Sequence, residues 1–158
     1  MKDLGPVKQF LGINIESDSD KIFLHQTNFA KSLLEKFGFE NCKPIATPSD
    51  VSSKQSSPDE EKFDDIEKYQ SAVGALLYMS TRTRPDLSYA VNNVAKFCSQ
   101  PCKSHWIAVK RIFRYIQGTL NFGILYEKSK VDSCFGFSDA DWAGTQVIEN
   151  QRPDTVLC

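Results

Sequence analysis

Between Ile66 and Gly118, apolar residues recur every three or four positions in three successive runs. This spacing predicts helices over about 66–80, 84–97 and 104–118. An amphipathic helix owes most of its stability to the packing of its apolar face, so three in succession predict a helical bundle. The residues expected to face inward are Tyr69, Val73, Leu76 and Leu77 in the first helix, Leu87, Ala90, Val91, Val94 and Phe97 in the second, and Trp106, Val109, Phe113 and Ile116 in the third.

Residue types at the helix ends agree with these boundaries. Pro85 and Asp86 suit the first turn of the second helix, because proline loses no hydrogen bond there and a carboxylate meets the positive end of the helix dipole. Ser104 is the expected N-cap of the third helix, and Gly118 is its expected stop.

The segments on either side of the bundle are rich in strand-forming residues. Runs at 9–15 and 21–25, separated by a polar turn, predict a hairpin, and a helix capped by Thr27 and stopped by Gly38 is expected next. The stretch 44–65 is rich in Ser, Pro and acids and predicts a loop, whereas 122–126 and 133–137 predict two paired strands. The predicted fold class is therefore α+β: an N-terminal β-hairpin plus helix, an acidic loop, a three-helix bundle and a short C-terminal β-hairpin.

Charge is distributed unevenly along this chain of 158 residues, although its net charge is only -1. Seven acids and two lysines lie between Asp50 and Glu67, a local charge of -5. Nine bases and two acids lie between Thr81 and Lys130, a local charge of +7. The second region therefore favours a polyanionic partner.

Four of these bases fall on the third predicted helix or at its start. Lys110, Arg111 and Arg114 are spaced i, i+1 and i+4, opposite the apolar face, and Lys103 comes just before the helix. Such a row can follow the phosphates of a nucleic-acid duplex, although an ordinary solvated helix face has the same pattern. Among the aromatic residues, most of which fall on core stripes, Tyr115 is the best candidate to stack on a base.

Two groups of residues contain side chains that commonly bind metal ions. The segment 137–144 carries Asp139 and Asp141, which are either the start of a carboxylate metal site or an Asp-rich turn that closes a hairpin. Cys98, Cys102 and His105 lack a fourth zinc ligand at finger spacing. The five scattered cysteines fit reduced thiols better than a disulfide framework.

The N-terminus lacks the apolar stretch of a signal peptide, and no run of 18 or more apolar residues occurs in the sequence. We therefore expect an intracellular protein, cytoplasmic or nuclear, without a membrane partner.

Seven blocks in order resemble part of the Pol polyprotein of a copia-type retrotransposon. The first joins Met1–Gly5 to Phe10-Leu11-Gly12-Ile13, and the others are Lys43–Pro48, Tyr69 with Val73–Tyr78, Thr83–Val91, His105-Trp106, Arg111–Thr119 and Ser138–Gly144. Together they cover residues 1–144 and are far more specific than any one of them.

The resemblance implies a role for each segment. Residues 1–48 resemble the end of the reverse-transcriptase palm, with Phe10, Leu11 and Gly12 at primer-grip positions. Residues 49–65 would be an acidic linker, 66–118 a thumb-like bundle, and 119–144 the start of an RNase H-like domain. Asp139 matches the first acidic ligand of that domain, with Asp141 as second choice, and 145–158 do not continue the family pattern.

The resemblance also indicates what is missing. The palm aspartates of the family precede the primer grip, and the further RNase H ligands lie well beyond the first strand, whereas only fourteen residues follow Gly144. We therefore expect a catalytically inactive fragment that retains no cofactor, although the parent family uses Mg²⁺. Its expected partners are an RNA–DNA or DNA duplex, contacted through the third thumb-like helix, and the missing Pol segments. The alternative is a non-enzymatic interaction or effector-like protein, or an inert remnant.

Overall fold

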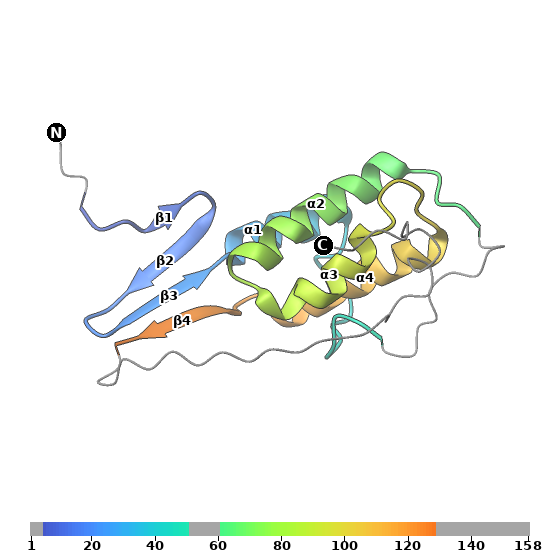
Figure 1. Ribbon diagram of the computed structural model, residues 1–158. Helices are drawn as coiled ribbons and strands as arrows, with labels where there is room; N and C mark the ends of the chain where they lie inside the picture. Colours follow the sequence, from blue (N-terminus) through green and yellow to red (C-terminus); the bar gives the residue numbers. More distant parts are fainter. Residues whose placement is uncertain (1–4, 51–60, 129–158) are drawn as a thin grey trace, which may run out of the picture. The chain divides into compact units, whose positions relative to one another are not determined.

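The computed structural model describes residues 5–50 and 61–128, and these belong to one compact unit that ends at Lys128. Figure 1 shows helices packed together and strands extending from one end of them. The α+β class predicted from the sequence is confirmed. In chain order the elements are β1 (Gln9–Phe10), β2 (Ile13–Ser17), β3 (Lys21–His25), α1 (Thr27–Phe37), α2 (Ile66–Arg82), the 3₁₀ turn η1 (Pro85–Leu87), α3 (Ser88–Ala95), α4 (Lys103–Gly118) and β4 (Gly123–Glu127).

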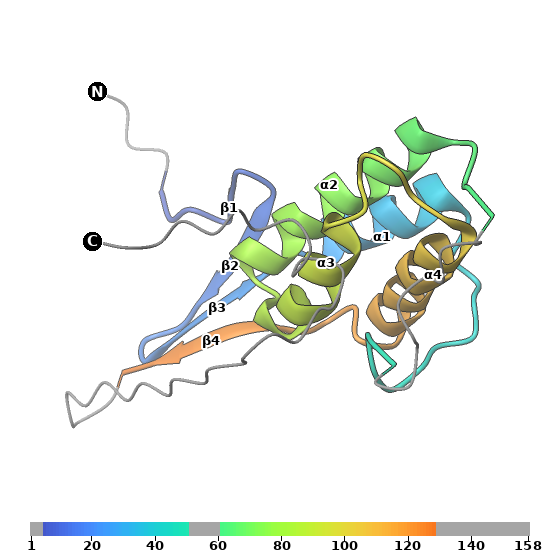
Figure 2. The same cartoon turned by 45° about the vertical axis from the view of Figure 1, so that its right-hand side comes forward.

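The strands form one antiparallel sheet in the order β1-β2-β3-β4 (Figure 2). The N-terminal hairpin is present, with Ile15 opposite Leu24. β4 pairs with β3, from Lys21 opposite Glu127 to His25 opposite Gly123, a pairing that the sequence analysis did not predict. The partner expected from the sequence, 133–137, lies outside the described residues. The chain therefore returns after α4 to the hairpin from which it began.

The core lies among all four helices, because α1 packs with the predicted three. Leu33 and Leu34 of α1 are buried, and the ring of Phe37 stacks on Phe113 of α4 with 5.1 Å between centroids. Tyr69 and Phe113 are fully buried, and each contributes about 1.5–3 kcal/mol through burial of its apolar surface.

The helix ends agree only in part with the sequence predictions. Gly38 has a φ of 74° and ends α1 as expected. Thr27 is not the cap, because it lies inside α1 and its hydroxyl donates to the Leu120 carbonyl at 3.1 Å. Ser104 is not the cap either, since α4 begins at Lys103 after Cys102. Cys102 instead caps α4 in a capping box with His105, whereas Gln26 before α1 makes no side-chain cap.

Gly123 is required at the junction of β3 and β4. A Cβ at this position would lie 2.3 Å from the Leu24 carbonyl oxygen, so the backbone would have to move. Gly123→Ala is expected to lower the free energy of unfolding by about 1–3 kcal/mol, as overpacking does. The measurement is the urea midpoint.

The control is Gly74→Ala on the exposed face of α2, where a Cβ meets nothing within 4 Å. It is expected to raise stability by about 0.5–1 kcal/mol, because alanine favours a helix over glycine. Equal effects of the two changes would contradict the close β3–β4 pairing.

Candidate nucleic-acid interface

The predicted basic row lies on α4. At about 100° per residue, Lys103, Lys110 and Arg114 fall within about 20° of one line along the helix, and Arg111 lies about 80° to the side. Lys103 is exposed, and the other three are half-buried. No ion pair of Lys110 is recorded among the described residues.

Both arginines of the row hold the segment that follows α1. Arg114 donates from Nε to the Lys43 carbonyl at 2.8 Å, and Arg111 donates from Nη2 to the Thr47 hydroxyl at 2.9 Å. Pro44 approaches Gly118 so closely that a Cβ there would lie 3.0 Å from the Pro44 Cβ. Segment 40–50 therefore runs along this side of α4, and the arginines are not simply solvated.

Two carboxylates also reach the row. Asp50 Oδ2 lies 3.5 Å from Arg111 Nη1, and Glu61 Oε1 lies 2.5 Å from Lys103 Nζ. Glu61 is positioned by the backbone, since its carbonyl accepts the Lys103 N–H at 3.0 Å. These contacts could not be predicted from the sequence, because 44–65 has no periodicity from which to place it against α4.

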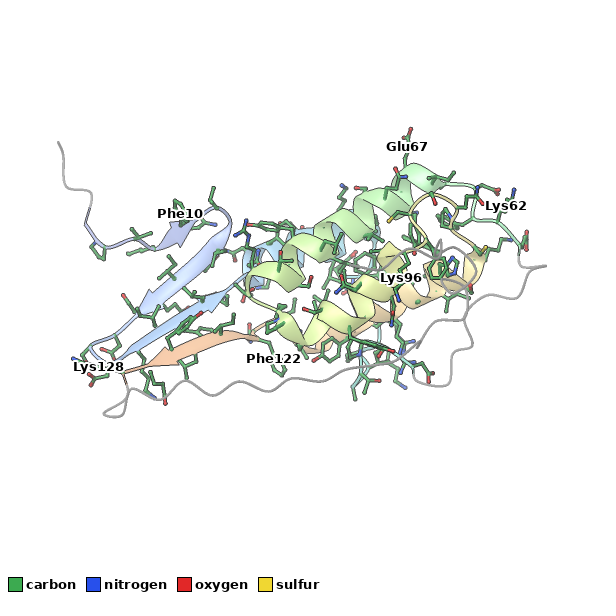
Figure 3. The ribbon with its side chains drawn as sticks, viewed as in Figure 1. Phe10, Lys62, Glu67, Lys96, Phe122 and Lys128 are labelled. Carbon is green, nitrogen blue, oxygen red and sulfur yellow. The ribbon has the colours of Figure 1, made fainter. Side chains whose placement is uncertain are left out.

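The Phe10-Leu11-Gly12 segment forms the turn between β1 and β2. Leu11 has a φ of 47° and Gly12 a φ of 75°, as a two-residue hairpin turn of the primed type requires. Glycine adopts this conformation freely, but leucine there costs about 1–2 kcal/mol. Phe10 and Leu11 nevertheless expose 61% and 68% of their surface. The turn therefore presents apolar side chains to solvent, and Figure 3 shows Phe10 at this edge of the sheet.

The strained turn is held by the bundle. The Tyr78 hydroxyl of α2 donates a hydrogen bond to the Leu11 carbonyl. A Cβ on Gly12 would lie 3.3 Å from the same hydroxyl. The ring of Tyr78 packs edge-on against Phe29 of α1, with 5.1 Å between centroids. Tyr78 thus fixes the tip of the hairpin relative to α2.

Arg84 is one of the nine bases between Thr81 and Lys130, but it is buried, with only 2% of its surface exposed. Its Nε and Nη2 donate to the Asp86 carboxylate, at 2.8 Å for Nη2 to Oδ2. Its Nη1 donates to the Thr119 carbonyl at 3.0 Å, and Nη2 also reaches the Thr119 hydroxyl at 2.7 Å. Its guanidinium carbon lies 5.4 Å from the ring centroid of Phe122. Arg84 therefore connects the end of α2, η1, the end of α4 and the start of β4.

Tyr115 belongs to the same network. Its hydroxyl donates to Asp86 Oδ2 at 2.9 Å, and its ring lies 5.6 Å from the Arg84 guanidinium carbon. Burial would raise the pKa of the Asp86 carboxyl, but the hydrogen bonds and charge of Arg84, with the Tyr115 hydroxyl, hold that pKa below its ordinary value. Burial, followed by the bond to Asp86, raises the pKa of Tyr115. The best base-stacking candidate of the sequence is thus engaged inside the fold.

Asp139 and Asp141 lie outside the described residues. Within 5–50 and 61–128, no group of three or more His, Cys, Asp or Glu side chains could hold a metal ion. His105 accepts the Cys102 backbone N–H at Nδ1, at 2.9 Å, and so stabilises the start of α4. In the same described parts of the chain, no helix combines the length and apolar character needed to cross a membrane.

Comparison with known proteins decides the family. A family model described as "Reverse transcriptase (RNA-dependent DNA polymerase)" matches residues 1–51, which include the hairpin and α1. The chain is 39% identical, over 98% of its length, to the retrovirus-related Pol polyprotein from transposon TNT 1-94 of Nicotiana tabacum. The chain belongs to the copia-type retrotransposon Pol family. The resemblance noted in the sequence is thereby confirmed.

Other relatives of this Pol segment are shorter. It is 42% identical over its whole length to an uncharacterized mitochondrial protein of Arabidopsis thaliana. It is 45% identical over 53% of its length to secreted RxLR effector protein 161 of Plasmopara viticola. The chain spans 64%, 58% and 12% of the mitochondrial, effector and Pol relatives, respectively. No solved structure matches it.

The Asp86 carboxylate should make the free energy of unfolding of the Pol segment depend on pH in the acidic range. Its folded-state pKa lies below the ordinary Asp value of about 3.9, so its contribution is complete above that value and is lost as pH falls through the folded-state pKa. Asp86→Asn is expected to cost about 1–3 kcal/mol at pH 7, because Arg84 loses its charged partner. The difference from the parent should shrink as the pH falls from about 4 to 2. Denaturant unfolding across this range measures it.

Asp64→Asn is the matched control, because Asp64 is an exposed carboxylate just before α2. It is expected to change stability by less than about 0.5 kcal/mol. If both variants lose the same stability at pH 7, the Asp86 network does not hold the fold.

Proposed function

We propose that this chain is a catalytically inactive reverse-transcriptase and RNase H segment that binds primer–template duplex without sequence preference. The observation that carries the proposal is the alignment of Lys103, Lys110 and Arg114 along one side of α4, with Arg111 beside them. Cations on one helix face can contact successive phosphates, and each contact releases counterions from the nucleic acid. Phosphate contacts position a protein without reading bases, as a polymerase requires.

The four cations have different parts in this proposal. Lys110 and Lys103 supply direct phosphate contacts, because neither holds segment 40–50 in place. Arg111 shares its guanidinium between Thr47 and Asp50 and can add a contact from its exposed side. Arg114 is a positioning residue, since its Nε is bound to the Lys43 carbonyl.

The hairpin turn supplies a second, uncharged contact. Phe10 and Leu11 are exposed. The Tyr78 hydroxyl bonds their turn to α2, which belongs to the same helical bundle as α4. In the proposed complex these primer-grip-like positions lie against the sugar and backbone of the primer strand. Strain at Leu11 that surrounding contacts maintain is typical of a functional position.

Catalysis is not part of the proposal. Polymerase and RNase H reactions use two metal ions held by several carboxylates. Asp139 and Asp141 alone supply too few oxygen ligands for two Mg²⁺ ions. We therefore assign Asp139 and Asp141 no metal and derive no reaction step from them.

A second candidate is an interaction protein with an effector-like role. It is favoured by the 45% identity, over 84 residues, to a relative named as a secreted effector. In that case the bundle would serve as a scaffold, and the α4 cations would only keep its surface soluble.

Binding to an RNA–DNA hybrid, followed by fluorescence anisotropy at several salt concentrations, tests the proposal. The parent chain is expected to bind with a dissociation constant of about micromolar or weaker, and with affinity that falls steeply as salt rises. Lys103→Gln with Lys110→Gln should weaken binding several-fold and reduce the salt slope by up to about two phosphates. Changing the duplex sequence should have little effect. With Mg²⁺, the parent should neither extend the primer nor cleave the RNA strand.

Lys31→Gln with Lys128→Gln is the control, because it removes the same charge from exposed positions on α1 and after β4. Binding without salt dependence, or equal loss in both double variants, would contradict the proposal and leave the interaction-protein candidate. Hybrid cleavage abolished by Asp139→Asn would overturn the assignment of inactivity.

A further inference from the structure

Two carboxylates of the chain occupy the basic row at two separate places. Asp50 contacts Arg111, and Glu61 contacts Lys103, eight residues earlier on α4. Eight helical residues span about 12 Å. The two pairs therefore lie at well-separated points of the face that we assign to phosphate.

The neighbouring segments are held on α4 by contacts that do not use these two carboxylates. Segment 40–47 is attached to α4 by uncharged groups as well, because Gln117 donates to the Glu40 carbonyl at 2.8 Å and Pro44 packs on Gly118. On the other side, the Phe63 N–H donates to the Pro101 carbonyl at 2.9 Å, next to the backbone bond between Glu61 and Lys103. The Glu61 side chain can therefore turn away from Lys103 while its backbone stays in position, and the contacts that hold segment 40–47 do not use the Asp50 side chain.

The two ion pairs are also weak enough to exchange. Their side chains are 33% and 46% exposed for Arg111 and Asp50, and 53% and 74% for Lys103 and Glu61. Ion pairs exposed to this extent contribute little, because water and salt screen them. A phosphate group carries the same negative charge to the same cations and can replace a carboxylate there.

We propose that Asp50 and Glu61 are intramolecular competitors of phosphate, so that duplex binding breaks the Asp50–Arg111 and Glu61–Lys103 pairs. This inference rests on the proposed duplex binding and concerns its regulation. The carboxylates neutralise two of the four cations in the free protein, and they repel an approaching polyanion. A duplex that contacts the whole row displaces both carboxylates.

The competition predicts both an affinity and a salt dependence. Asp50→Asn with Glu61→Gln should tighten binding to the RNA–DNA hybrid by about two- to tenfold, because the two cations no longer have an internal anion to lose. In the parent, salt weakens the phosphate contacts but also weakens the internal ion pairs, which partly offsets the loss of affinity. The variant lacks this offset, so its affinity should fall more steeply as salt rises. The urea midpoint should stay close to that of the parent.

Glu35→Gln with Glu67→Gln is the charge-matched control. Both residues are exposed, on α1 and α2, and Figure 3 shows Glu67 pointing away from the other helices. This variant changes the net charge equally and should alter affinity less than twofold. Equal effects of the two double variants would overturn the competition but leave duplex binding intact. If neither the parent nor the Asp50 and Glu61 variant binds the hybrid, duplex binding itself fails.

Discussion

The arrangement of bundle and sheet depends on one buried guanidinium. Arg84 lies where α2 ends, and its hydrogen bonds reach Asp86 in η1 and Thr119 just after α4. A buried ion pair is weak evidence for stability by itself, because desolvation offsets much of its attraction. Its geometry is nevertheless restrictive, since four N–H groups must each meet an acceptor in fixed directions. The end of α4 can therefore occupy only one position relative to α2.

The position of the sheet follows from that constraint. After Thr119 the chain passes Leu120, whose carbonyl accepts the Thr27 hydroxyl, and enters β4 beside β3. At the far edge, Tyr78 of α2 holds the Leu11 turn. The hairpin is thus attached to the bundle at two places, through β4 and through its tip. The two proposed contact surfaces, the α4 row and the Phe10–Gly12 turn, therefore belong to one compact unit.

Local pattern was enough to predict the helices but not their long-range partners. The 3.6-residue period located α2, α3 and α4, and Gly38 ended α1, because both signals lie within one element. The β3–β4 pairing joins segments about a hundred residues apart, and no local signal sets such a register. Arg84 resembled a surface base, since burial depends on what the rest of the fold places around it. Its one sequence clue was the acid two positions later.

The same distinction between local pattern and long-range contacts applies to the candidate site. Helical spacing predicted Lys110, Arg111 and Arg114 on the third helix with Lys103 just before it, which required no tertiary information. The structure includes Lys103 in α4 and places Arg111 to the side of the other three cations. That Arg114 binds the Lys43 carbonyl, and that Asp50 and Glu61 reach the row, depends on an aperiodic segment whose path only the fold determines. The strain at Leu11 was equally invisible, because leucine is not a residue that predicts a positive φ.

Native-state amide hydrogen exchange on the parent and on Arg84→Met tests the central claim most directly, namely that Arg84 makes bundle and sheet one cooperative unit. In the parent, amides of β3 and β4 should open with free energies close to those of the buried turns of α2. In Arg84→Met, the β4 amides should exchange at least about tenfold faster relative to α2, because the end of α4 is no longer fixed. If the sheet already exchanges independently in the parent, or if the variant leaves sheet and bundle equally protected, Arg84 does not couple them.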